Sequence, residues 1–124
     1  MKLIAWVLFV LSLLCYSDAI AVAGSDLDTE MKKAADQIKL VRGKGRCVQS
    51  KQCKVVGLGA ELCGGYDGYF IYSTLDADEK QVLAWVARFN VRAEELHKTS
   101  LMVEHCAPKL RVAHCMKDLC RVVD

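Results

Sequence analysis

The spacing of the cysteines constrains the fold of this chain more than any other feature. The 124 residues contain seven cysteines, and all but Cys15 follow residue 46. An even number of cysteines behind an N-terminal leader predicts a disulfide framework and an oxidising compartment, with no thiol left for catalysis. The six cysteines expected in disulfides are Cys47, Cys53, Cys63, Cys106, Cys115 and Cys120.

The leader has the organisation of a secretory signal peptide. Met1-Lys2 precedes an uncharged apolar run over 3–14, which is shorter than the roughly 20 residues needed to span a bilayer. Cleavage after Ala19 and cleavage after Ala23 both satisfy the small-x-small rule, and we favour Ala23 because a polar segment follows it at once. Lipidation at Cys15 is disfavoured because bulky Leu14 precedes it. We predict a signal peptide over 1–23, one domain over 24–124, and a secreted or periplasmic location.

The apolar periodicity predicts two helices and several short strands. One helix is expected over about 27–41 and a longer one over about 77–98, where Asp76 and Glu79 resemble a capping box. β-rich runs predict strands at 53–58 and 69–72, and the tail contains three short apolar stretches, 101–106, 110–115 and 119–123. Residues 116–119 have the length of a hairpin connection. This order predicts an α+β fold, a small antiparallel sheet packed on one long helix with an additional N-terminal helix.

Six cysteines permit 15 pairings, and the sequence alone does not choose among them. Short loops cost little entropy to close, which favours Cys47–Cys53 and Cys115–Cys120. The remaining bridge would then be Cys63–Cys106, which spans the long helix and would be the most stabilising of the three.

The stretch over 63–73, CGGYDGYFIYS, admits two interpretations. Glycine beside a bridged cysteine permits a tight corner that leads into a strand, in which Tyr69 and Ile71 lie on one face and Phe70 and Tyr72 on the other. Alternatively, a flexible loop presents Tyr66 and Tyr69 to a partner. We favour the corner, because the local sequence is a sufficient reason for the glycines.

Over about residues 46–123 the chain resembles a group of small secreted Cys-rich bacterial proteins, mostly of unknown function. The resemblance rests on the pattern C-x5-C-x9-C-G-G, an aromatic stretch that ends in Tyr72-Ser73, a long helix and a terminal C-x4-C. Those proteins commonly have proline where this chain has Tyr66, and glycine where it has Lys117-Asp118. The resemblance implies disulfides and a periplasmic or extracellular location, and it implies no activity.

Two further classes of function are weighed against binding. His105-Cys106 and His114-Cys115 repeat a dipeptide that could bind zinc or copper, although exported cysteines are usually oxidised and a histidine beside a strand cysteine points to the opposite face. No cofactor is therefore expected. An enzyme is also disfavoured, because no nucleophile elbow or His-Glu-x-x-His motif is present, although a spatial assembly of Ser73, Asp76 and His97 stays open.

The charge distribution suggests where a partner would bind. The net charge of +2 gives no indication of nucleic-acid binding for the chain as a whole, and no stable membrane insertion is expected after leader cleavage. The segment over 32–54 is nevertheless strongly basic and contains a single acid, Asp36. We predict an exported binding protein, of the inhibitor or immunity type, whose partner is another envelope or extracellular protein. The candidate partner-binding residues are Tyr66, Tyr69, Lys44 and Arg46.

Overall fold

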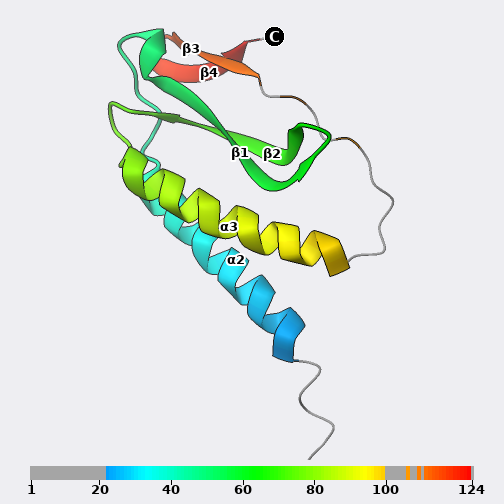
Figure 1. Cartoon of the computed structure of the whole chain (residues 1–124). Coiled ribbons are helices and arrows are strands. Elements are labelled where there is room, and N and C mark those ends of the chain that lie inside the picture. Colours follow the sequence, from blue (N-terminus) through cyan, green and yellow to red (C-terminus); the bar gives the residue numbers. More distant parts are fainter. Residues whose placement is uncertain (1–21, 100–105, 107–108, 110, 124) are drawn as a thin grey trace, which may run out of the picture.

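The fold is α+β, as predicted. The structure, a computed structural model, describes residues 22–99, 106, 109 and 111–123. The elements run α2 (Val22–Val41), the 3-10 turn η1 (Ser50–Gln52), β1 (Cys53–Leu62), β2 (Gly65–Ser73), α3 (Glu79–Thr99), β3 (Val112–Met116) and β4 (Leu119–Val123). Figure 1 shows α2 and α3 side by side, with the β1–β2 hairpin above them and the β3–β4 hairpin beyond it.

Most predicted elements form, with shifted ends. The predicted ends near 41 and 98 agree with the helices within one residue, whereas α2 begins at Val22, so the candidate caps at 25–29 lie inside it. Both central strands extend beyond their predicted runs, and the predicted strand at 119–123 is β4. The single sheet that we expected is two separate two-stranded antiparallel sheets. The predicted stretch at 101–106 lies outside the described residues except for Cys106, as does the leader over 1–21.

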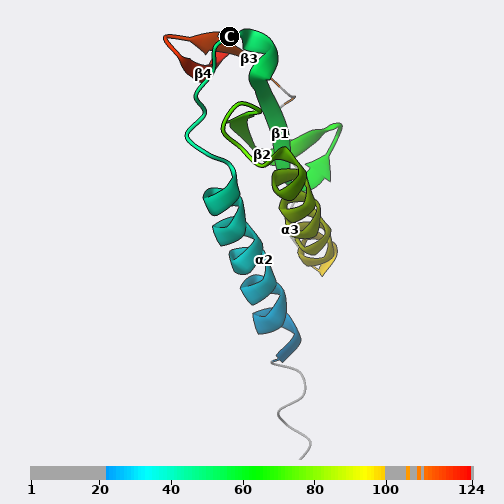
Figure 2. The ribbon, with the colours of Figure 1, turned by 90° about the vertical axis from the view of Figure 1, so that its left-hand side faces the viewer.

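The β1–β2 hairpin has apolar side chains on both faces. Phe70 and Tyr72 face the helices, where Tyr72 joins a buried cluster with Ile38, Val82 and Val86. Ile71 points the other way, toward a second cluster formed by Cys47, Cys53 and Ala113 under the β3–β4 hairpin. The two faces of this strand therefore serve two small cores, and Figure 2 shows the resulting order of helices, central hairpin and terminal hairpin.

Two tight turns close the hairpins. Cys63 and Gly64 have φ values of 56° and 81°, and Lys117 and Asp118 have φ values of 52° and 62°. Positive φ at both central residues is the signature of the mirror-image turns that match the twist of a hairpin. This confirms the corner interpretation of the CGG stretch and the predicted hairpin at 116–119. Of the three glycines considered there, only Gly64 occupies the turn, since Gly65 and Gly68 lie within β2.

A β-bulge in β1 is held by a side chain of α3. The register between β1 and β2 shifts between Leu58 and Glu61, and Gly59 has a φ of 108°. The side-chain oxygen of Asn90 accepts the Gly59 N–H at 2.8 Å, and its amide nitrogen donates to the Gly57 carbonyl at 3.2 Å. Asn90 therefore binds two backbone groups of β1 beside the point where the ladder is interrupted.

The start of α3 differs from the predicted capping box. Asp78 rather than Asp76 accepts a backbone hydrogen bond from Gln81 at 3.1 Å, which holds the pKa of its carboxyl below the usual range. Glu79 accepts the Tyr72 hydroxyl at 2.8 Å, and burial together with this carboxylate raises the pKa of Tyr72 to about 12. The predicted cap was wrong because two aspartates lie within reach of the same helix start, and Asp76 binds a different loop.

Within residues 22–99, 106, 109 and 111–123, no helix is both long enough and apolar enough to cross a bilayer.

Candidate binding surface

Three disulfides join the predicted cysteines, but two of the expected pairings were wrong. The bridges are Cys47–Cys115, Cys53–Cys120 and Cys63–Cys106. Only the last agrees with the pairing favoured from loop lengths. The first two tie the terminal β3–β4 hairpin to the residues on either side of η1. Such bridges form in oxidising compartments, so the structure supports that part of the predicted location.

The strand register explains the unexpected pairing. Cys115 and Cys120 lie directly opposite one another in β3–β4, so both side chains project from the same face of the hairpin. That face covers the start of β1, where Cys47 and Cys53 are buried. Each hairpin cysteine therefore meets a cysteine from the segment below it, and the folded geometry outweighs the short loops that favoured local bridges.

Hydrogen bonds join the loop after α2 to Asp76, which lies between β2 and α3, and also to the β3–β4 hairpin. One carboxylate oxygen of Asp76 accepts the backbone N–H groups of Lys44 and Arg46 at 3.0 and 3.1 Å. The Cys120 N–H donates to the Gly45 carbonyl, and the Cys47 N–H donates to the Asp118 carbonyl. The loop is therefore fixed by backbone contacts as well as by the bridges.

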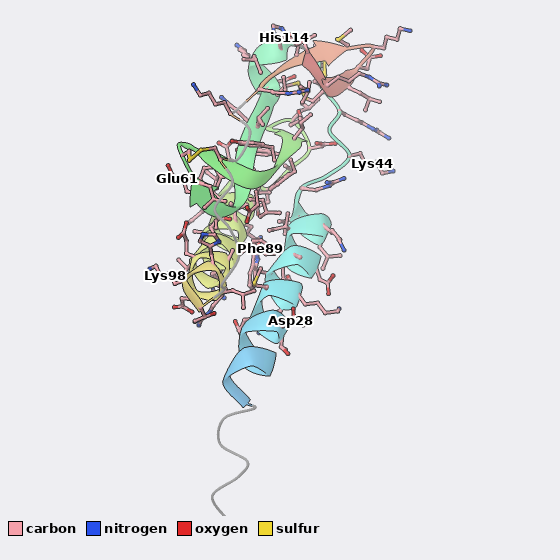
Figure 3. The ribbon with its side chains drawn as sticks, turned by 90° about the vertical axis from the view of Figure 1, so that its right-hand side faces the viewer. Asp28, Lys44, Glu61, Phe89, Lys98 and His114 are labelled. Atoms are coloured by element: carbon pink, nitrogen blue, oxygen red, sulfur yellow. A yellow bond between two sulfur atoms is a disulfide. The ribbon has the colours of Figure 1, made fainter. Side chains whose placement is uncertain are left out.

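This packing gathers positive charge from two distant parts of the sequence. We define the basic end as residues 42–54, 109 and 111–123, in which Asp118 is the only acid. The remaining described residues carry more acids than bases. Figure 3 shows Lys44 and His114 toward this end and Asp28 and Lys98 toward the other. The basic residues of the end are Arg42, Lys44, Arg46, Lys51, Lys54, Lys109, Arg111, Lys117 and Arg121.

The basic end contains a cleft of about 410 Å³. Its walls are the loop over 42–45, the β2 residues 69–71, and Cys120 and Val122 of β4. Arg42 and Lys44 supply positive charge at this cleft, and Tyr69 supplies an aromatic ring with a polar hydroxyl. Exposed apolar side chains also occur in the basic end, where Val48 is 77% and Val112 is 64% exposed. The surface therefore combines charge, apolar area and a concave feature.

Three of the four candidate partner-binding residues belong to this surface or border it. Lys44 and Tyr69 line the cleft, and Arg46 is exposed beside it in a bridge to Leu119. Tyr66, which is half-buried, contributes to the fold: its ring lies over Gly57, where any side chain would clash with it, and it packs edge-to-face on Tyr69 with ring centroids 6.2 Å apart. The Tyr66 N–H also donates to the Tyr69 hydroxyl at 3.0 Å.

Sequence reasoning missed the contribution of the terminal hairpin. The sequence identified the basic segment over 32–54, but not the cations at 109–121 that complete the surface. Only the pairing of Cys47 with Cys115 and of Cys53 with Cys120 could have placed these cations beside the loop. Conversely, Lys32 and Lys39 form ion pairs with Asp36 on α2 and lie outside the basic end.

The histidine site for metal receives no support from the described geometry. His114 is exposed on β3, while the neighbouring Cys115 points inward to its bridge. This is the alternation expected along a strand. His105 lies outside the described residues.

The chain matches no protein-family model, no curated protein and no solved structure. The function is therefore inferred from the fold and its surface.

Proposed function

We propose that this is an exported binding protein whose basic end contacts an acidic surface of another envelope or extracellular protein, as an inhibitor or immunity-type protein would. The observation that carries the proposal is the concentration of nine cations and one acid over residues 42–54, 109 and 111–123, on a surface tied together by two disulfides. Charge of one sign attracts an oppositely charged partner and accelerates association. The bridges keep the two halves of the surface in register, which lowers the entropic cost of binding.

A protein partner is favoured over an extended polymer or a flat lipid surface. The cleft beside Tyr69 offers a concave site for one inserted side chain. Tyrosine, arginine and methionine are enriched in protein interfaces, and Met116 is 45% exposed on the terminal hairpin. The proposed partner therefore presents acidic side chains around a protruding group.

Binding rather than catalysis is proposed because the displaced pKa values serve the fold. The pKa of Asp36 is lowered by its hydrogen bond from Lys32, and that of Asp78 by the helix start. Tyr72 is buried against Glu79 within the first core. None of these three groups lines the cleft of the basic end.

Export is proposed from the leader together with the disulfides. A periplasmic or extracellular location would supply the oxidising conditions that three bridges need. The resemblance to secreted Cys-rich bacterial proteins points the same way.

Charge reversal tests the proposal. Fluorescence anisotropy would measure binding of labelled poly-L-glutamate, as a probe of acidic polypeptide, to the wild type and to K44E/R46E. Each of the two reversals removes an attraction and adds a repulsion. Each of these four changes is worth roughly 0.2–1 kcal/mol at an exposed site, so the affinity should fall by about fourfold or more. Binding should also weaken as salt rises.

The matched control is K80E/K98E, which makes the same change of net charge on exposed positions of α3. Equal loss in the two double variants would contradict a localised site. Vesicles of anionic phosphatidylglycerol form a second arm, and binding to vesicles but not to polyglutamate would reject the protein-partner proposal in favour of a lipid surface. Crosslinking in envelope extract should then recover an acidic protein with the wild type and the control, and less of it with K44E/R46E.

A further inference from the structure

Two of the disulfides lie side by side and bring three of their sulfur atoms into one close group. The Sγ atoms of Cys47, Cys53 and Cys120 all lie within 4.8 Å of one another, and Cys115 is bonded to Cys47. Cys47 and Cys53 are only 3% and 8% exposed. In the part of the chain that the structure describes, this is the one group of metal-ligating side chains that meets so closely.

The backbone holds these cysteines together independently of the bridges. Cys115 and Cys120 are paired positions of β3–β4, and the Cys115 N–H donates to the Ser50 hydroxyl at 3.0 Å. The Cys47 N–H and Cys120 N–H bind carbonyls across the loop–hairpin contact at 3.0 and 2.9 Å. Breaking the S–S bonds removes none of these hydrogen bonds, so the four thiols have a reason to stay near one another.

We propose that reduction of both bridges converts this cluster into a zinc site, in which the thiolates of Cys47, Cys53, Cys115 and Cys120 bind one Zn²⁺. A dithiol reductant would supply two electrons and two protons to each bridge and would itself become a cyclic disulfide. Zn²⁺ would then displace the four thiol protons to solvent. The site goes beyond the proposed binding function and does not depend on it.

The geometry suits a tetrahedral site after a small adjustment. Zn–S bonds of about 2.3 Å place the sulfur atoms of a tetrahedral site about 3.8 Å apart. The bonded pairs would separate to this distance, the Sγ atoms of Cys47, Cys53 and Cys120 already lie within 4.8 Å of one another, and Cys115 would rotate toward them. The Cα–Cα separations of 5.8 and 5.4 Å across the two bridges leave room for side-chain rotation to make the change.

The surrounding charge also favours thiolates. A zinc ion with four thiolates carries a net charge of −2, and cations nearby lower the pKa of a thiol. Arg46, Lys54 and Arg121 each adjoin a ligand in the sequence, and all belong to the basic end. This site uses four sulfurs and neither His105 nor His114, so it differs from the histidine site considered from the sequence.

Metal titration of the reduced chain tests the proposal. The mature protein would be reduced with dithiothreitol, desalted without oxygen and titrated with Zn²⁺ against a chromophoric chelator, with Co²⁺ as a spectroscopic substitute. The expected result is one ion per chain and the visible absorption of tetrahedral cobalt thiolate. C47S/C115S and C53S/C120S should each weaken binding by more than the roughly 100-fold lost with an outer-shell partner. The matched control, C63S/C106S, removes the third bridge and should bind as the wild type does.

A second readout uses the wild type alone, so it does not depend on the folding of any variant. Zn²⁺ should slow alkylation of the four cluster cysteines, read by peptide mass, and leave Cys63 and Cys106 as reactive as before. No binding by the reduced wild type, uniform protection of all six cysteines, or equal loss in C63S/C106S would each overturn the site.

Discussion

Removing the two hairpin bridges one at a time and then together should reveal that they act as one unit. The test compares C47S/C115S, C53S/C120S and the quadruple variant. The Cys47–Cys115 bridge closes a loop with a sequence separation of 68, and Cys53–Cys120 one of 67. Either bridge, in the presence of the other, constrains only the short ring formed by 47–53 and 115–120.

The chain-entropy model gives the magnitudes. Because the Cys63–Cys106 bridge stays intact in all three variants, one hairpin bridge without the other closes a ring of about 26 residues through it. A loop of about a dozen residues corresponds to about 2.8 kcal/mol, and one of about 26 residues to about 3.5 kcal/mol. Loss of the first bridge should therefore cost about 2.8 kcal/mol, and loss of both about 6.3 kcal/mol. The quadruple variant should exceed the sum of the two double variants by about 0.7 kcal/mol, because the second loss opens the larger ring.

Guanidinium unfolding followed by Trp85 fluorescence would measure these differences, since Trp85 packs against the first core. A loss of about 6 kcal/mol is comparable to the total stability of a small domain, so all variants would be measured in a stabilising osmolyte. Strictly additive costs would refute the coupling. If the pairings were instead Cys47–Cys53 and Cys115–Cys120, each double variant would already break both bridges, so all three variants should lose about the same, roughly 4.5 kcal/mol.

Three further results are expected. The raised pKa of Tyr72 means that its stabilising contribution is complete below pH 10 and is lost as the pH rises toward 12. The wild type should therefore lose on the order of 2 kcal/mol of stability over that range, and Y72F should not. N90A should cost about 1–3 kcal/mol in chemical denaturation, since it leaves two bulge groups of β1 unpaired, and an equal cost for the exposed-site variant K98A would contradict this role. G57A should lower the melting temperature more than G68A, because a Cβ at Gly57 enters the aromatic ring beside it while one at Gly68 makes an ordinary contact; similar melting temperatures would refute that packing.

Much of the fold could be predicted from short-range patterns. The periodicity of Val82, Val86 and Ala93 marks the buried face of α3. The turn at 116–119 followed from its length. These features depend on residues close in sequence or on one element, which a pattern can report.

The basic end could be predicted only in part because it depends on long-range docking. Residues 42–54 and the terminal hairpin are separated by the whole central hairpin and α3. Their contact depends on the face of β3–β4 that carries Cys115 and Cys120, and a loop-length argument does not contain that information. Asp76 illustrates the same limit, since it resembles a helix cap but binds the backbone of Lys44 and Arg46.

Disulfide mapping of the native protein tests the central claim most directly, because the proposed surface exists only if the loop and the hairpin are joined. The chain would be digested without reduction, with free thiols blocked first, and the linked peptides identified by mass. The expected links are Cys47 to Cys115, Cys53 to Cys120 and Cys63 to Cys106, with no blocked thiol. Links from Cys47 to Cys53 and from Cys115 to Cys120 would free the hairpin from the loop and contradict the basic end as a single binding surface.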